Sequence, residues 1–173
     1  MSNRAVFVGG RQAGCVGLLA LAAARWEIGH VVAYDVEVAG VARALGLPVE
    51  RSVHAQASVE ALRGADLLVS VHGREIVPDA LLRLPHGGGV NVHPCLYAYP
   101  GADPVGRLLA DGNPRASVGV HRMTAEVDAG EVLVEEFVDV AAETSVAGVY
   151  NALYPAYART LLAALPLAVG NPA

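Results

Sequence analysis

Short apolar, β-branched runs alternate with helix-forming segments through the first half of the chain, and this alternation constrains the fold more than any other feature. The predicted strands are residues 4–10, 30–35, 48–53, 65–73 and 88–93. The predicted helices are residues 14–28, 37–46, 58–64 and 78–84. Strands separated by helices pair in parallel through right-handed crossovers. The pattern therefore predicts an open, mostly parallel, twisted α/β sheet with helices on both faces.

Two residues set predicted helix ends in this half. Gly29 follows the first helical segment and is a typical stop signal. Ser58 is a candidate N-cap of the third helix, since serine at that position accepts a hydrogen bond from a free backbone N–H.

The second half of the chain has a different pattern. Residues 103–112 form a predicted helix with Asp103 as its cap, and residues 116–123 and 131–140 are strand-like. The gap between these strands is too short for a crossover helix, so they should pair antiparallel. A last helix is predicted at residues 144–165, kinked or broken at Pro155. Its core stripe should consist of Val149, Leu153, Tyr157, Leu161 and Leu165. The expected fold is thus Rossmann-like, with about seven strands and an antiparallel pair near the C-terminal end.

The composition limits the classes of function. The chain has 173 residues, 54% hydrophobic and 17% charged, which suits one globular domain over residues 1–173 and is compatible with a homodimer. The net charge is −5 and the 12 Lys and Arg residues are scattered, which argues against nucleic acid. The longest strongly apolar stretch, residues 15–24, is too short to span a membrane, and no export signal is expected. Two cysteines without a Cys-x-x-Cys pair favour the reducing cytoplasm.

A glycine-rich turn, "VGGRQAG", follows the first predicted strand. It matches a dinucleotide fingerprint only in part, because Arg11 occupies the place of the middle glycine; Asp35 stands where a ribose-binding acid belongs. A tight strand-to-helix turn explains the glycines equally well. A third interpretation is a phosphate site, in which Gly9 and Gly10 expose backbone N–H groups at a helix N-terminus beside Arg11.

Polar side chains interrupt the apolar strand at residues 88–93. Asn91 and His93 are two residues apart and so share one face of that strand. In open α/β sheets ligands bind at the carboxyl ends of strands, although a satisfied polar pair would give the same pattern. Asp128 lies in a short loop between two later strands. An amide and an imidazolium can stabilise an oxyanion, and a carboxylate can assist proton transfer, so the three residues would suffice for acyl transfer to an amine.

The other candidate groups have weaker support. The six histidines show no His-x-x-x-His or His-Glu-x-x-His spacing, so we expect no metal site. His72 ends the fourth strand and His121 lies in the sixth. Cys95 is a rival nucleophile, but no nearby cation in the sequence would lower its pKa.

Residues 91–133, "NVHPCLYAYPGADPVGRLLADGNPRASVGVHRMTAEVDAGEVL", resemble the active-site half of the folate-dependent formyltransferases. These include phosphoribosylglycinamide formyltransferase, methionyl-tRNA formyltransferase and the nucleotide-sugar N-formyltransferases. The motif consists of Asn-x-His-Pro at a strand end, a small-residue loop, a helix ending in glycine, a strand carrying a histidine, and Asp-x-Gly. Its members here are Asn91, His93, Pro94, Gly101, Gly112, His121, Asp128 and Gly130.

The resemblance implies a reaction and a set of roles. A primary amine would attack the formyl group of N10-formyltetrahydrofolate, without a metal. Asn91 and His93 would act on the formyl oxygen and transfer a proton, while Asp128 would support His93 and help to deprotonate the amine. The family places the pterin in a slot between two loops, which here are Arg74, Glu75, Ile76 and Val77 and, before the acid, Ala125, Glu126 and Val127.

Departures from the family pattern concern the acceptor. Residues 95–104, "CLYAYPGADP", replace the usual loop, so Cys95, Tyr97 and Tyr99 should contact an unusual acceptor. The absence of a C-terminal barrel argues, with the acidic charge, against a tRNA. The leading hypothesis is therefore N-formylation of a small amine, such as a nucleotide-linked amino sugar. A formyltetrahydrofolate hydrolase uses the same three residues, and a non-catalytic nucleotide-binding module would not bring them together.

Overall fold

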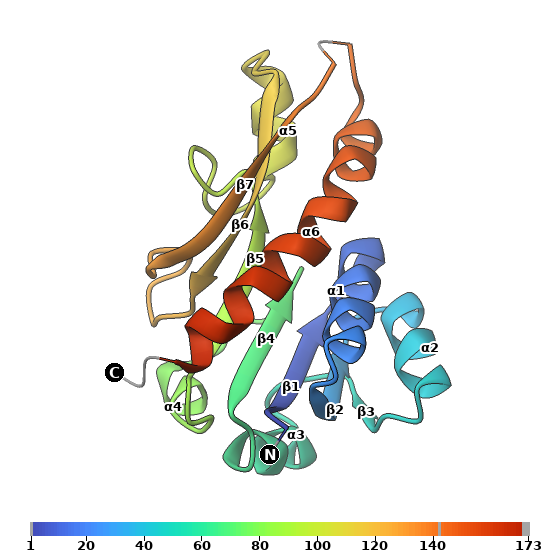
Figure 1. The fold of residues 1–173 in the computed structure, drawn as a ribbon, viewed down its shortest axis with the longest axis vertical. Coiled ribbons are helices and arrows are strands. Elements are labelled where there is room, and N and C mark those ends of the chain that lie inside the picture. The colour runs from blue at the N-terminus through green and yellow to red at the C-terminus, as the bar shows by residue number, and fades with distance from the viewer. Residues whose placement is uncertain (1, 142, 171–173) are drawn as a thin grey trace.

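The computed structural model describes residues 2–141 and 143–170, so residues 1, 142 and 171–173 of the predicted domain lie outside the described residues. Within them a single seven-stranded sheet forms in the order β3-β2-β1-β4-β5-β6-β7 (Figure 1). The strands are β1 (Arg4–Gly9), β2 (Glu27–Ala33), β3 (Val49–Glu50), β4 (Leu67–Val71), β5 (Gly89–Pro94), β6 (Arg115–Arg122) and β7 (Val132–Asp139). The first five strands pair in parallel, and β6 and β7 pair antiparallel. The predicted fold class is confirmed.

Helices cover the sheet unequally on its two faces. They are α1 (Arg11–Ala23), α2 (Val36–Ala44), α3 (Gln56–Arg63), α4 (Asp79–Leu82), α5 (Pro104–Ala110) and α6 (Val146–Val169). Along β1, Ala5 and Phe7 enter a large core with α1, α2, α5 and α6, while Val6 and Val8 enter a smaller core with α3 and α4. Alternation along a strand sends neighbouring side chains to opposite faces, and both are buried here, which explains the continuous apolar run.

The prediction of the helix ends was wrong at two positions. Gly29 lies inside β2, and the first helix ends earlier because Arg25 takes a left-handed backbone conformation with φ 61°. Ser58 does not cap α3, whose N-cap is Ala55. The hydroxyl of Ser58 is buried instead, and it donates a hydrogen bond to the Ser52 carbonyl at 2.8 Å. Asp103 does occupy the N-cap position of α5, but its side chain makes no capping hydrogen bond.

The last helix, α6, packs diagonally across the sheet (Figure 1). Its predicted stripe from Val149 to Leu165 is buried as expected, whereas the alternative of a break at Pro155 is wrong because the helix runs through it. By length and composition alone α6 could cross a membrane. Its buried face contacts α1, β5, β6 and β7, as in the core helix of a globular protein.

The smaller core ends before it reaches the antiparallel strands. It occupies the face of β1, β2 and β4 beneath α3 and α4. On this face a row of polar residues crosses three neighbouring strands, since Ser70 pairs with Asn91 and Asn91 pairs with His121. The sheet therefore presents a polar floor beside α4.

Candidate active site

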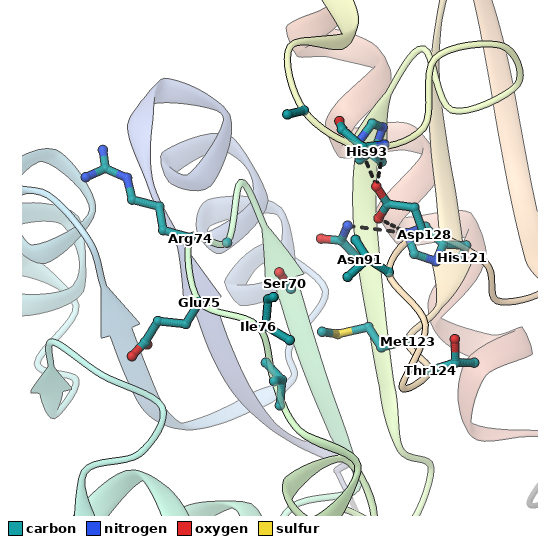
Figure 2. A pocket seen from close by; sticks show the side chains of 15 residues that line it. Ser70, Arg74, Glu75, Ile76, Asn91, His93, His121, Met123, Thr124 and Asp128 are labelled. Carbon is teal, nitrogen blue, oxygen red and sulfur yellow. Dashed lines mark hydrogen bonds and ion pairs between the residues drawn. The ribbon is translucent and has the colours of Figure 1, made fainter.

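Asn91, His93 and Asp128 lie close together at the carboxyl end of β5 (Figure 2). Nε2 of His93 is 3.2 Å from Oδ2 of Asp128, which arrives from the loop between β6 and β7. Asn91 reaches the same carboxylate through His121, because Nε2 of His121 lies 3.3 Å from Asn91 Nδ2 and 3.3 Å from Asp128 Oδ1. The interpretation as a non-catalytic module required that these groups stay apart, and they do not.

Both ring nitrogens of His93 face oxygen acceptors. Nδ1 lies 2.8 Å from the carbonyl oxygen of Pro94. Nε2 lies 3.1 Å from the carbonyl oxygen of Gly101, in addition to Asp128. A ring that donates from both nitrogens carries a positive charge. The surroundings of His93 are thus complementary to an imidazolium, which can donate a hydrogen bond to a developing negative charge.

His121 is part of the cluster, although the sequence interpretation gave it no catalytic role. Its side chain is buried, and its Nδ1 donates to the backbone carbonyl of Arg122 at 2.8 Å. Because the Nδ1 proton is used in this hydrogen bond, Nε2 faces the other two residues. In a neutral His121 ring Nε2 can accept a hydrogen bond from the Asn91 amide, whereas in a protonated ring it can donate one to Asp128. The antiparallel register that places His121 opposite Asn91 is the signal that would have found it.

Asp128 is held as a carboxylate. Hydrogen bonds from His121 and then from His93 lower the pKa of its carboxyl far below the ordinary 3.8, against the opposing effect of burial. The backbone N–H of Gly101 donates to its Oδ2 at 2.8 Å. The loop after β5 therefore folds back onto the cluster, where Gly101 contacts His93 through its carbonyl and Asp128 through its N–H.

A cavity of about 300 Å³ opens beside this cluster. It lies between the connection that follows β4 and the loop before Asp128, where the sequence placed the pterin slot (Figure 2). Its walls are Ser70, Gly73, Arg74, Glu75, Ile76, Val77, Asn91, His93, Gly101, Ala102, His121, Met123, Thr124, Val127 and Asp128. Of the predicted residues before the acid, Val127 lines the cavity and is exposed, whereas Ala125 and Glu126 are outside the lining.

Glu75 borders the cavity but turns its carboxylate away from it (Figure 2). The carboxylate accepts hydrogen bonds from the hydroxyl of Tyr34 at 2.9 Å, the hydroxyl of Ser52 at 2.5 Å and the backbone N–H of Val53 at 2.9 Å. Burial opposes the charge, but these three donors outweigh it and lower the pKa of Glu75. The side chain thus fastens the cavity wall to the segment after β3 and leaves backbone groups to face a ligand.

A second cavity, of about 350 Å³, meets the first at the cluster. The two share Gly73, Asn91 and His93. The rest of its lining is Arg11, His72, Val92, Pro94, Asp103, Pro104 and Tyr150. Asn91 and His93 therefore form a wall that can be approached from two sides.

The glycine-rich turn brings Arg11 to this second cavity, whereas Gly9 and Gly10 are outside its lining. A Cβ on Gly9, the last residue of β1, would come within 2.6 Å of the Phe7 ring, so this position is packed too closely for a side chain. Asp35 accepts from the backbone N–H of Arg11 at 2.5 Å and from that of Val38 at 3.1 Å, which makes it the cap of α2. Because Asp35 is engaged in these bonds, the dinucleotide interpretation loses its ribose-binding acid.

The three residues predicted to contact the acceptor in the loop after β5 are turned away from both cavities. Cys95 is fully buried, and burial raises the pKa of its thiol, which makes it a poor nucleophile. The hydroxyl of Tyr97 donates to the Arg115 carbonyl at 2.6 Å, and that of Tyr99 donates to Asp111 at 3.0 Å. The loop contributes Gly101 and Ala102 to the first cavity instead, since its aromatic side chains pack against the sheet edge and the core.

Strained backbone is concentrated around the two cavities. Among residues 2–141 and 143–170, six non-glycine residues have positive φ, and four of them line a cavity: Arg11, His72, Asp103 and Asp128. Such conformations cost about 1–3 kcal/mol each and cluster at functional sites. In the described residues no group of three or more His, Cys, Asp or Glu side chains is placed to hold a metal ion.

A mostly parallel sheet with a buried His-Asp pair at the end of a strand, beside two cavities, defines a Rossmann-like protein with a candidate catalytic cluster. Residues 5–165 match the family described as Formyl transferase. The chain belongs to this family, whose members transfer formyl groups.

Relatives differ in their printed activities. The chain is 38% identical over 117 residues to a methionyl-tRNA formyltransferase of Acidithiobacillus ferrooxidans, which covers 65% of the chain and 37% of that protein. It is 34% identical over 76 residues to the GDP-perosamine N-formyltransferase of Brucella melitensis, covering 43% of the chain and 29% of that protein. The chain thus spans about a third of the length of these relatives.

Solved structures share the fold. Phosphoribosylglycinamide formyltransferase from Streptococcus pneumoniae superimposes with a TM-score of 0.78 at 24% identity, covering 99% of this chain and all of that one. A formyltetrahydrofolate deformylase from Pseudomonas syringae gives 0.78 at 21% identity, covering 94% of this chain and 59% of that one. At these identities the likeness concerns the fold alone.

Proposed function

We propose that this protein transfers the formyl group of N10-formyltetrahydrofolate to the primary amine of a small molecule. The observation that carries the proposal is the wall formed by Asn91 and His93, which separates two cavities and borders both. A formyl donor in one cavity and an amine in the other would meet at these two side chains.

The first cavity fits a flat, hydrogen-bonding ring such as a pterin. Ile76, Val77, Met123 and Val127 give it apolar surface, and the backbone of residues 73–77 gives it peptide groups. The charged ends of Arg74 and Glu75 point away from it (Figure 2). A neutral heterocycle would therefore meet apolar contacts and backbone donors and acceptors rather than unmatched charges.

The geometry supports a role for each of these side chains. The Asn91 amide and the His93 imidazolium can donate to the formyl oxygen as negative charge develops there. Asp128 orients the His93 ring, and as a carboxylate it can accept a proton from the attacking amine. The amine nitrogen adds to the formyl carbon, which places negative charge on the formyl oxygen, and the bond from that carbon to N10 then breaks as the carbonyl re-forms. The proton lost by the amine balances the one gained by N10.

The acceptor proposal favours a small molecule over a tRNA. The 12 Lys and Arg residues of the chain are few for a polyanion, and the second cavity has the volume of a small-molecule site. A nucleotide-linked amino sugar is one such acceptor, consistent with the likeness to a GDP-perosamine N-formyltransferase. We further propose that the protein is a single catalytic domain in the cytoplasm and that it forms a homodimer, which a measurement of its mass in solution tests.

An assay of tetrahydrofolate release tests the proposal. The protein is mixed with N10-formyltetrahydrofolate and a panel of amino-sugar nucleotides, phosphorylated amines and aromatic amines. Release that requires one amine, and that His93→Ala abolishes, is the expected result. Release without any amine would establish the hydrolase instead, with water in the second cavity. If no folate binds and none is consumed, both enzyme functions are excluded.

A further inference from the structure

Two tyrosine hydroxyls differ from the other four of the chain. Those of Tyr34, Tyr97, Tyr99 and Tyr157 hydrogen-bond to protein groups. Those of Tyr150 and Tyr154 have no such partner among residues 2–141 and 143–170, and both side chains line a third cavity, of about 560 Å³. These hydroxyls are therefore available to water or to a ligand.

The third cavity continues the second. Arg11, His72 and Tyr150 line both, and the third adds Gln12, Ala13, Val146, Ala147, Asn151 and Tyr154. A molecule whose amine lies beside Asn91 and His93 can therefore extend past Arg11 towards the rings of Tyr150 and Tyr154. None of these tyrosine positions was singled out by the sequence as a ligand contact.

The ring of His72 packs against the ring of Tyr150. The two rings meet edge to face, with centroids 5.4 Å apart at 68°. The buried Tyr157 hydroxyl lies 2.7 Å from His72 Nε2. Burial, Arg11 and His93 lower the pKa of His72 to about 4, so the ring is neutral near pH 7 and its Nε2 can accept a hydrogen bond from the Tyr157 hydroxyl. The aromatic surface is thus held by the protein before any ligand arrives.

The second and third cavities together form a path from Asn91 and His93 to Tyr154, and few charged side chains line it. Arg11 is the sole Arg or Lys in the lining of the second and third cavities. Its guanidinium makes no ion pair within the part of the chain that the structure describes, and it is exposed. Asp103, the sole acid in these linings, borders the portion nearest to Asn91 and His93. The second cavity therefore holds both a carboxylate and a cation beside Asn91 and His93, whereas Arg11 is the charged residue that lines the third cavity as well.

We propose, resting on the function proposed above, that the acceptor carries an aromatic ring and an anionic group in addition to its amine. The ring packs against Tyr150 and Tyr154, the anionic group binds Arg11, and the amine reaches Asn91 and His93 past Asp103. A phosphorylated amine without a ring leaves the tyrosine surface uncovered. A nucleotide-linked amino sugar and a simple aryl amine with a phosphate or carboxylate both satisfy this chemistry.

Binding of two matched anions tests the proposal without turnover. Phenyl phosphate and cyclohexyl phosphate have the same charge and similar size, but only the first has an aromatic face. Titration calorimetry should show roughly two- to tenfold tighter binding of phenyl phosphate, the range expected for one aromatic pair. Tyr150→Ala should remove that preference, and Arg11→Gln should weaken both anions alike.

Two variants outside the cavities serve as controls. Phe137→Ala removes an aromatic ring on β7, and Arg63→Gln removes a cation at the end of α3; neither should alter the binding of either probe. Uridine monophosphate then distinguishes the two kinds of acceptor. If the protein binds it more tightly than phenyl phosphate, a nucleotide-linked acceptor is favoured. If the protein binds it more weakly, a simple aryl amine is favoured.

Three results would overturn the inference. They are equal binding of the two anions, a preference that survives Tyr150→Ala, or the absence of any binding at millimolar concentrations. Folate binding measured on the same protein distinguishes the two proposals. If the folate binds and the anions fail, formyl transfer stands while the aromatic acceptor is excluded.

Discussion

Nε2 of His93 lies 3.2 Å from Oδ2 of Asp128, although α5 and β6 separate the two residues along the chain. Both side chains are nearly buried, with exposed fractions of 11% and 8%. A buried carboxylate requires a partner, and His93 and His121 supply it from two sides. Each side chain of this pair therefore depends on the other. Replacing either one should change both the catalytic rate and the free energy of unfolding.

Asp128→Asn should lower kcat while leaving folate affinity within about threefold. Asparagine has the size of aspartate but cannot accept the proton of the amine, and loss of such assistance costs about 10²- to 10⁴-fold. Steady-state assays and folate titration of the variant measure the two effects. Asp139→Asn, at the exposed end of β7, is the matched control. A kcat equal to that of the wild type would remove Asp128 from the mechanism.

The same carboxylate should make stability depend on pH. Its pKa is lower in the folded protein than the ordinary 3.8, because hydrogen bonds from His121 and His93 favour the charged form. The stabilisation is therefore fully present above the unfolded pKa and is lost as the pH falls through the folded one. Urea unfolding at several pH values should show wild type more stable than Asp128→Asn at pH 6, with the gap narrowing below about pH 4. A gap that is constant from pH 6 to pH 3 would contradict the assignment.

Glu75→Gln should raise the KM for the folate about three- to tenfold and leave kcat nearly unchanged. The carboxylate accepts from three donors, and an amide has a single acceptor oxygen, so at least one donor would face an NH₂ group. The segment that walls the first cavity would loosen, far from the reacting atoms. Glu60→Gln, on the surface of α3, is the control. An equal fall in kcat would mean that Glu75 acts on the chemistry rather than on the wall.

Local patterns were sufficient to predict the fold and part of the site. The strand and helix alternation predicted the parallel half of the sheet, and the short gap before residue 131 predicted the antiparallel pair. Asn91 and His93 could be placed because strand periodicity and the proline after them determine their face. Each of these predictions uses only residues that are close together in the sequence, and a local sequence pattern contains that information.

The parts of the site that the sequence did not predict depend on the register of the strands and on the conformation of the loops. His121 joins the site because the antiparallel register sets it opposite Asn91, and that pairing is fixed by contacts distant in sequence. Cys95, Tyr97 and Tyr99 were expected to face the acceptor, but the loop turns at Cys95, with φ 54°, and buries two of them. Glu75 lines the cavity where the pterin slot was expected, but the hydrogen-bond donors to its carboxylate come from segments distant in sequence and could not be predicted from a local pattern.

Gly130 of the Asp-x-Gly motif should tolerate no side chain. A Cβ at this position would lie 1.8 Å from the carbonyl oxygen of Arg122, the same oxygen that accepts the Nδ1 proton of His121. Gly130→Ala must therefore displace the loop that carries Asp128 or the backbone that orients His121. We expect a loss of about 1–3 kcal/mol in the free energy of unfolding, as for an overpacked site. A shift of about 1 Å in the carboxylate would also lower kcat by about 10²-fold.

Gly40→Ala is the matched control for that loss. Gly40 lies inside α2, and nothing comes within 4 Å of a Cβ added there. Alanine at this position should raise the free energy of unfolding by up to about 1 kcal/mol, because glycine loses more backbone entropy in a helix. Urea unfolding and steady-state kinetics on both variants separate the two cases. A Gly130→Ala protein with wild-type kcat and stability would show that the loop adapts without moving Asp128, and the motif glycine would then need another explanation.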